Sequence, residues 1–519
     1  MLRFLLAFAV GAGVMIKVQA EPLKTGWASR DISTSEPVGI RGQLYLRISQ
    51  KLLDPLSVTA LAVDNGKDAV IFLSMDNLCL PKHIKGAISG AVTKLAPEIP
   101  VRKIFMNVTH SHTTGDLFRS QQGFPKDVLR MPGRKYADFF VRRAAEAVVE
   151  AWRKRTAGGV AWGYGYAVVG HCRRTVYFDD ASKRSGATAS IPGIMINGHC
   201  VMHGNTNDRQ FSHFETGPDS HVNLLFTFDP KGKLTGAIIN IPCPSQSSGN
   251  MSMLSADYWH DVRLALRAKY GNIFILPQCA AAGDITPRIL YYKQAQERRF
   301  RLKYGRKAEY QGEFYRKDCA ERIAAAFDEV YSWARKDIRY SLPVIHIIED
   351  IKISRRLVSD AEFKQEKKIL AELEKTPPAA GDPAQRLRHD SYLVSKLNRC
   401  RSIIRRYKEQ KHKPKGDVEL HVVRIGDIAF TSCPFELYTD YMLRIQARSP
   451  FEQTFVVQLA NTVDVCGYVP TERAEKNSGY SADRYSSRVS SRGGQELVEK
   501  TLKILKQIKT NKVTKKGRP

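Results

Sequence analysis

The sequence predicts an α/β protein, of the α+β kind, built on a large mixed β-sheet that is flanked by helices. Short apolar runs alternate with turn signals between residues 27 and 278. Helical stretches, whose apolar residues recur at spacings of three and four, lie between these runs. A strongly helical region, residues 290–415, then precedes another alternating pattern, which indicates a helical hairpin inserted between strands.

The expected strands are rich in β-branched and aromatic residues and are bounded by turn residues. They read SVTALAVD (57–64), AVIFLSMD (69–76), KIFMNV (103–108), VNLLFTFD (222–229), GAIINIPC (236–243), NIFILPQ (272–278) and VELHVVRIGDIAFTSC (418–433).

The expected helices are amphipathic. They cover residues 83–96, 136–154, 257–271, 319–336, 362–375, 388–410 and 493–509. The prolines and the glycine of TPPAAGDPAQ (376–385) break the last pair of the insert. No internal repeat and no long polar linker is visible, so residues 21–500 are expected to form one domain.

The first twenty residues predict export. A basic start at Arg3 precedes an apolar run from Phe4 to Ile16, and Ala20 stands before Glu21. This pattern is typical of a secretory signal peptide over residues 1–20, so the mature protein is expected to be secreted or periplasmic. Nine cysteines without a tight cluster do not resemble a disulfide scaffold.

The composition is strongly basic, with 81 Lys and Arg against 52 Asp and Glu, or a net charge of +29. Such an excess favours polyanionic partners, such as an anionic membrane surface or an acidic glycan. No nucleic-acid-binding motif is present, so nucleic acid is not expected as a partner. Residues 501–519 form a basic tail, which is either a solvated end or a docking device.

The stretch VTHSHTTGD (108–116) places His110 and His112 two positions apart, just after an expected strand. Side chains at i and i+2 of a strand point the same way, so both imidazoles would face one space. The pair is either part of a metal site or two polar residues on the rim of a strand.

Four further polar stretches lie at or just beyond the ends of expected strands, where open sheets usually collect functional groups. They are GHCRRTVYFD (170–179), NIPCPSQSSG (240–249), CAAAGDITPR (279–288), and CPFELYTD (433–440) with CGYVPTERAE (466–475).

The order of these motifs resembles the catalytic domain of the neutral/alkaline, non-lysosomal ceramidases, which are exported or membrane-surface zinc amidases. The matching elements are THSH (109–112), IPCPS (241–245), GDITP (283–287), CPFE (433–436) and YVPT (468–471). The resemblance covers most of residues 21–500 and implies Zn²⁺ as cofactor. The metal ligands that it implies are His110, Cys243, Glu436 and Tyr468.

Two positions depart from the family pattern. Cys243 stands where the family has its second zinc histidine, and Thr286 stands where it has the active-site serine. A thiolate is a sound zinc ligand, so the changed site is chemically admissible. The alternative is that Cys243 is a small buried residue and the metal site is degraded.

The resemblance also implies roles for the remaining polar residues. Zinc would polarise an amide carbonyl and activate water. His112 would donate to the oxyanion or carry a proton to the leaving amine. Arg173 would stabilise negative charge, whereas the adjacent Arg174 should point the other way. Asp284 and Thr286 would orient the water or the substrate head group, and the extra methyl of threonine disfavours direct attack.

The leading hypothesis is an exported zinc-dependent hydrolase that cleaves an amide bond, as a ceramidase does, in a small-molecule or lipid substrate. One alternative is a related hydrolase that acts on another amide or an ester, such as an amino-sugar or glycan derivative. The other is a non-catalytic polyanion-binding protein whose metal site is degraded.

Overall fold

The computed structural model describes residues 22–118, 128, 130–185, 187, 198–462 and 467–510. The expected signal peptide and residues 511–519 of the expected tail lie outside this range. Cys466 also lies outside it, and the eight cysteines within it are all buried free thiols. No helix in the described part of the chain combines the length and the apolar character that crossing a bilayer requires.

The first sheet has the strand order β7-β6-β5-β1, with a short fifth strand, β8 (Thr156–Ala157), at its edge. Three strands run antiparallel, and the fourth lies parallel to the third. The four are β1 (Lys24–Asp31), β5 (Ser57–Asp64), β6 (Ala69–Met75) and β7 (Ile104–Val108). A parallel pair needs a crossover connection, which α1 (Lys82–Leu95) supplies. The helix α2 (Gly133–Arg153) packs beside α1 against this sheet.

This arrangement occurs three times in the chain. In each unit three antiparallel strands are followed by a helix and by a fourth strand parallel to the third. The second unit contains β9 (Gly159–Tyr166), β14 (His221–Phe228), β15 (Leu234–Ile241), α3 (Tyr258–Tyr270) and β17 (Phe274–Cys279). The third contains β19 (Val344–Ser354), β20 (Lys415–Ile425), β21 (Ile428–Ser432), α8 (Thr439–Arg448) and β23 (Gln453–Val457).

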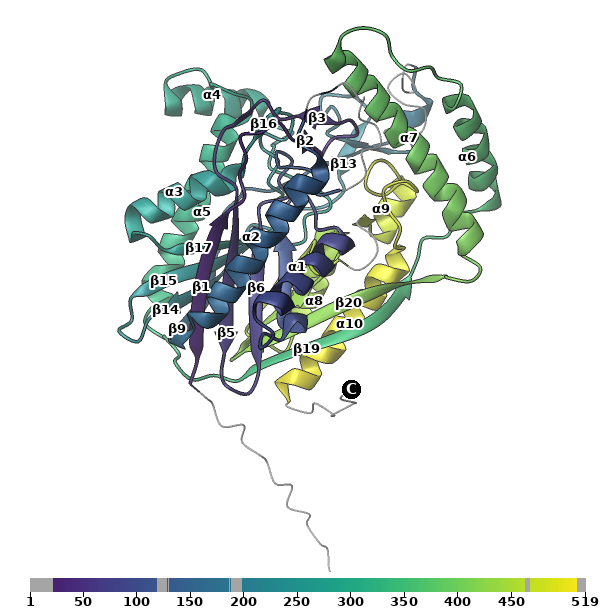
Figure 1. Cartoon of the computed structure of the whole chain (residues 1–519). Helices are drawn as coiled ribbons and strands as arrows, with labels where there is room; N and C mark the ends of the chain where they lie inside the picture. Colours follow the sequence, from purple (N-terminus) through teal and green to yellow (C-terminus); the bar gives the residue numbers. More distant parts are fainter. Residues whose placement is uncertain are drawn as a thin grey trace, which may run out of the picture.

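A further helix covers each of the later sheets, α5 (Glu313–Ala334) on the second and α10 (Ser491–Lys509) on the third (Figure 1). The structure therefore contains a repeat that is not visible in the sequence. What is repeated is the topology, and a shared strand order leaves no residue pattern for the sequence to show.

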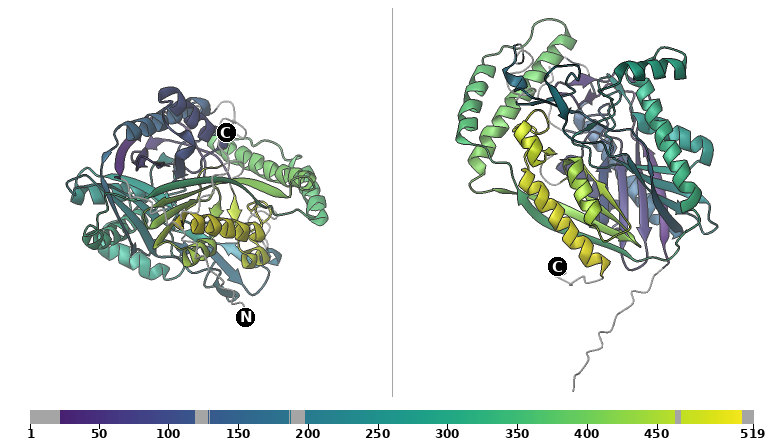
Figure 2. Two further views of the ribbon diagram at one scale, coloured as in Figure 1. Left: turned by 90° about the horizontal axis from the view of Figure 1, so that it is seen from below. Right: turned by 180° about the vertical axis from the view of Figure 1, so that it is seen from behind.

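The three sheets enclose one apolar interior, around which the purple, teal and yellow-green units are grouped in Figure 2 (left). Strand β6 shows how the sequence achieves this. Val70 and Phe72 face the shared interior, whereas Ile71, Leu73 and Met75 pack under α1 and α2. The period-two alternation of a strand thus gives each sheet two apolar faces, one for its own helices and one for the other sheets.

Further short elements connect the strands and helices of the three units. The strands among them are β2 (Gly39–Ile40), β3 (Arg47–Ile48), β4 (Lys51–Leu52), β10 (His171–Cys172), β11 (Arg174–Tyr177), β12 (Cys200–Met202), β13 (Phe211–Phe214), β16 (Met253–Leu254), β18 (Ile285–Thr286), β22 (Glu436–Leu437) and β24 (Tyr468–Val469). The helices among them are α4 (Lys293–Tyr304) and α9 (Glu472–Asn477).

The predicted α/β class is confirmed, but the predicted helical insert, residues 290–415, is corrected. It consists of two helical pairs, α4 with α5 and α6 (Asp360–Leu373) with α7 (Pro383–Glu409), and the long strand β19 lies between them. The pair α6 and α7 stands beside the third unit, at the upper right of Figure 1.

Local signals set the limits of this second pair. Helix α6 begins with a capping box in which Ser359 and Glu362 satisfy each other's backbone N–H groups. Helix α7 begins at Pro383. The carboxylate of Asp382, the residue before it, caps the helix by accepting hydrogen bonds from two backbone N–H groups. At the other end of the chain α10 runs to Lys509, so the first residues of the expected tail 501–519 are helical.

Candidate active site

A cavity of about 530 Å³ lies where the parallel strand pairs of the three units end. Six of the eight residues expected at the site line it, and Cys243 and Asp284 are not among its described lining residues. The six are His110, His112, Arg173, Thr286, Glu436 and Tyr468.

The two histidines converge, although not for the expected reason. Strand β7 ends at Val108, so both lie in the following loop, and His110 adopts a left-handed conformation with φ 60°. This turn brings their Nε2 atoms to 3.4 Å from each other. The strand position predicted for them is therefore wrong, while the shared direction of the rings is correct.

The protonation of His110 follows from its neighbour. Its Nδ1 lies 2.8 Å from the carbonyl oxygen of Leu78, which can only accept, so Nδ1 carries the proton. Nε2 therefore faces the cavity, 3.2 Å from Oε2 of Glu436. Burial opposes the charged form, but the Glu436 carboxylate outweighs it and raises the pKa of His110. His112 is partly buried beside His110, and desolvation lowers its pKa well below the usual range.

Backbone bonds hold the histidine loop in place. The N–H of Thr109 donates to the carbonyl of Met75 (3.1 Å), and the hydroxyl of Ser245 donates to the carbonyl of Thr109 (2.8 Å). The hydroxyl of Ser111 donates to the carbonyl of Ser255 (2.9 Å). The loop is thereby fixed to the first and second units together.

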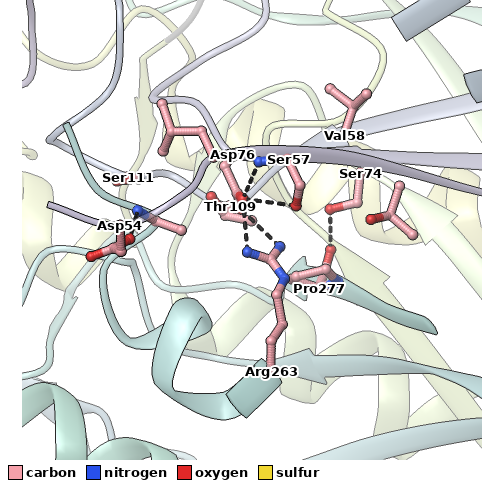
Figure 3. Close-up of polar contacts among 12 residues, drawn as sticks. Asp54, Ser57, Val58, Ser74, Asp76, Thr109, Ser111, Arg263 and Pro277 are labelled. Atoms are coloured by element: carbon pink, nitrogen blue, oxygen red, sulfur yellow. Dashed lines mark hydrogen bonds and ion pairs between the residues drawn. The ribbon is translucent and has the colours of Figure 1, made fainter. Parts of the chain in front are cut away.

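A buried ion pair lies beneath this loop (Figure 3). Arg263 of α3 reaches Asp76, at the end of β6, with a nitrogen–oxygen distance of 2.8 Å. Asp76 also accepts from the N–H of Ser57 at 2.9 Å. A paired and hydrogen-bonded charge is tolerated in the interior, and here it connects the helix of the second unit to the strands of the first.

Glu436 and Tyr468 come from different segments but are adjacent in space. Strands β22 and β24 pair in parallel with Glu436 opposite Tyr468. Burial opposes ionisation of Glu436, but His110 and Arg173 overcome it and lower the pKa of the carboxyl. The pKa of Tyr468 lies well above its usual range because the phenol is buried beside that carboxylate.

Arg173 lies over the rings of Tyr468 and Tyr480, with its guanidinium carbon 5.2 and 5.6 Å from their centres. Its Nη2 donates to the carbonyl of Gly283 at 2.7 Å. Arg174 points the other way, as expected, and forms a fully buried ion pair with Glu215.

Thr286 and Asp284, two residues apart, take different positions. Thr286 lies in β18 and lines the cavity. The Asp284 carboxylate is buried and accepts from the N–H (3.1 Å) and the hydroxyl (2.9 Å) of Thr439, at the start of α8. Its expected contact with water or substrate is corrected to a structural one, because the carboxylate is used to hold a helix N-terminus.

Cys243 requires a second correction. Its thiol is fully buried and donates to the carbonyl of Val169 at 3.4 Å. Burial beside Cys319 and Cys279 raises the pKa of the thiol well above its usual range. The structure thus favours the alternative stated above for this position, a small buried residue.

The expected ligands other than Cys243 carry nitrogen and oxygen donors of the kinds that bind divalent cations. Two ligands of one tetrahedral ion with bonds near 2 Å lie about 3.3 Å apart, close to the 3.2 Å that separates Nε2 of His110 from Oε2 of Glu436. The Nδ1–H bond of His110 to a carbonyl is the supporting contact that metal-bound histidines usually have. No three His, Cys, Asp or Glu side chains within the described residues form a complete metal-holding group.

Several cavity residues were not expected from the sequence. They are Gly42, Leu78, His203, Arg288, Arg399 and Tyr480. Arg288 ends the CAAAGDITPR stretch, so its place two residues after Thr286 was a usable signal. Arg399 lies within α7, a helix whose sequence pattern gave no indication that it reaches the cavity.

Some proteins of known structure have a similar architecture. No protein-family model and no curated protein sequence matches the chain. Among solved structures, the neutral ceramidase from Pseudomonas aeruginosa is similar with a TM-score of 0.66 at 13% identity, over 96% of this chain and 76% of that one. A ceramidase complexed with C2 is similar with a TM-score of 0.62 at 12% identity, over 96% and 77%. The chain therefore has a ceramidase-like α/β fold.

Proposed function

We propose that this protein is a metal-dependent hydrolase that cleaves an amide bond. The observation that carries the proposal is the approach of His110 and Glu436, more than three hundred positions apart in sequence, to 3.2 Å at the wall of the cavity. Burying a histidine and a carboxylate is costly unless they are paired or bind an ion. The ceramidase-like fold supports the same reading, although fold alone does not define a reaction.

Three residues are proposed to hold a zinc ion, and Cys243 is not among them. The proposed ligands are His110, Glu436 and Tyr468, and His112 keeps its expected role as a donor to the oxyanion or carrier of a proton. Zinc in such a site supplies a Lewis acid for an amide carbonyl. Leu78 fixes the tautomer of His110, and Arg173 favours the ionised form of Glu436.

The other polar residues are proposed to act on the substrate. Arg173 carries a positive charge against the cavity, where it stabilises an oxyanion. The hydroxyl of Thr286 orients the substrate amide from the cavity wall.

The substrate is proposed to be the amide of a lipid or of another molecule with an apolar part. Apolar side chains line the cavity beside the polar cluster, as is usual for small-molecule sites. They are Leu44, Leu78, Phe118, Met202 and Leu459.

Metal content tests the proposal directly. We expect the purified protein to contain about one zinc per chain by elemental analysis, and the variants His110→Ala and Glu436→Gln to lose it. The variant His213→Ala, which removes an exposed histidine, is the matched control and should keep the metal. Hydrolysis of N-acyl amides should be lost together with the zinc.

The alternative function, a non-catalytic binding protein, makes the opposite prediction. Metal-free protein that keeps its thermal stability and hydrolyses no amide would establish it. Export is part of the proposal as well, and mass spectrometry of the mature protein should find Glu21 as the first residue.

A further inference from the structure

A second cavity, of about 370 Å³, adjoins the first. It lies between the loop of residues 41–46 and helix α7. Five of the lining residues are common to both cavities, which therefore meet at a shared wall. They are Arg41, Gln43, Leu44, Phe118 and Arg399.

One face of α7 supplies the polar wall of the second cavity. Its lining residues recur at spacings of three and four, which places them on one side of a helix. They are Ser391, Val394, Ser395, Asn398, Arg399 and Ser402. Hydroxyl, amide and guanidinium groups on one face form a surface that donates hydrogen bonds.

The charge of the combined cavities is strongly unbalanced. Five arginines line them, whereas Glu436 is the one acidic residue among the described lining residues. The arginines are Arg41, Arg173, Arg288, Arg399 and Arg488. Glu436 is already engaged by His110, and Arg41 is paired with Asp116 at 2.7 Å.

Arg399 lies on the wall that the two cavities share, and part of its guanidinium has no hydrogen-bond partner among the residues that the structure describes. Its Nη1 atom is buried and has no hydrogen-bond partner within the described part of the chain. Arg399 interacts electrostatically with Asp483, whose Oδ1 accepts from the N–H groups of Tyr485 and Ser486 at 2.8 and 2.7 Å. Burial raises the pKa of Asp483, and the charge of Arg399 opposes this shift. An unsatisfied buried donor costs free energy unless a ligand binds it.

We propose that the substrate amide carries an oxyanionic group, a carboxylate or a phosphate, and that Arg399 binds it where the two cavities meet. Ser395 and Asn398 of α7 donate the accompanying hydrogen bonds, because they lie on the same helix face. This inference rests on the proposed function, since it places the bond to be cleaved near His110 and the anion toward α7. A guanidinium suits both oxyanions because it donates two parallel hydrogen bonds.

Three amides with one acyl chain test the proposal. N-lauroylethanolamine is neutral, N-lauroylglycine carries a carboxylate, and N-lauroyl-O-phosphoethanolamine carries a phosphate. Their dissociation constants are measured by calorimetry with the full-length mature protein, and their hydrolysis is followed separately. We expect at least one anionic amide to bind about tenfold more tightly than the neutral one, and added salt to reduce this preference. The tighter of the two anionic ligands identifies the group.

The variant Arg399→Gln should abolish the preference, so that the ratio of the two dissociation constants falls to near one. Arg405→Gln removes an exposed arginine of the same helix and should keep the wild-type ratio. Absence of any preference in the wild type, or a preference that survives in Arg399→Gln, overturns the inference. Selective binding without hydrolysis instead contradicts the proposed function while the anion site stands, so the two failures are distinguishable.

Discussion

At the scale of single residues, the orientation of His112 depends on a neighbour without a side chain. Gly42 has φ +107°, and a Cβ atom built there would lie 2.8 Å from Cγ and Nδ1 of the His112 ring. The Gly42 backbone also forms a hydrogen bond with this histidine. Gly42 therefore sets both the room and the direction available to the imidazole.

The variant Gly42→Ala should reduce activity and zinc affinity by about 10- to 100-fold, as the loss of supporting contacts at metal sites usually does. The added methyl displaces the ring of His112 from the cavity, since the contact distance is too short for a carbon atom. Zinc titration and amide hydrolysis measure the effect.

Backbone strain alone must be separated from this displacement. Gly66→Ala provides the control, because Gly66 also has a positive φ, +79°, and no atom lies within 4 Å of the added Cβ. It should lose stability to the same degree but keep zinc affinity. Equal loss of metal in both variants would contradict the role given to Gly42.

At the scale of elements, helix α1 of the first unit is joined to strand β20 of the third by a partly buried set of polar side chains. Lys85 of α1 forms an ion pair with Glu419 of β20, and His421 donates to the same carboxylate at 2.9 Å. Burial opposes ionisation of Glu419, but these two partners overcome it and lower its pKa from 4.5 to about 2.

This pKa predicts a pH dependence of stability. Because the folded pKa is lower than the unfolded one, the contribution of Glu419 is complete above pH 4.5 and is lost as the pH falls toward 2. The free energy of unfolding of the wild type should fall over this window by about 2 kcal/mol more than that of Glu419→Gln. Urea unfolding at several pH values measures it.

Glu372→Gln serves as the control for this measurement, since its carboxylate is mostly exposed and is paired with the exposed Lys375. Its unfolding curves should follow those of the wild type at every pH. Parallel curves for Glu419→Gln and the wild type would show that the tie between α1 and β20 contributes nothing to acid stability.

Sequence patterns located most elements because their signals are local. The run SVTALAVD is strand β5 without a change of limits, and the amphipathic stretches became helices. Strand β19 was missed because its outer part, with Glu349, Asp350 and Lys352, carries charges typical of helices. Its partner is β20, some seventy residues away in sequence, and pairing at that distance leaves no local mark.

The sequence predicted correctly which site residues follow the ends of strands. It did not predict how deeply each side chain is buried. Arg173 faces the cavity and Arg174 the interior, as strand alternation predicts. Cys243 and Asp284 stand in motifs of the right kind, yet both side chains are turned into the protein. Depth depends on how the three units pack together, which a single sequence does not specify.

At the scale of the whole molecule, side chains from all three units pack together in one core. The ring of Phe72 in the first sheet lies 5.5 Å from that of Phe105 and 4.8 Å from that of Phe430 in the third sheet. Leu225 and Ile238 of the second sheet belong to the same buried cluster. A unit cannot unfold without exposing the inner faces of the others.

The protein should therefore unfold in a single cooperative transition, and Phe72→Ala should destabilise all three units together. Truncation of a buried phenylalanine costs about 3–5 kcal/mol. Calorimetry and far-UV circular dichroism should report the same lowered midpoint.

The control is Leu302→Ala on α4, where the side chain is mostly exposed and little stability should be lost. Two separate transitions in the wild type, or loss of one unit alone in Phe72→Ala, would show that the units are independent domains.

Each of the three units also contributes a different chemical group to the cavity. The loop after the parallel pair of the first unit brings imidazoles, the second brings a hydroxyl through Thr286, and the third brings a carboxylate through Glu436. Each contribution comes from a connection outside the three large sheets, so a change in one connection alters the side chain at the cavity while the sheets stay intact. In a protein built in this way, the chemical groups of the cavity can change one loop at a time without a change of fold.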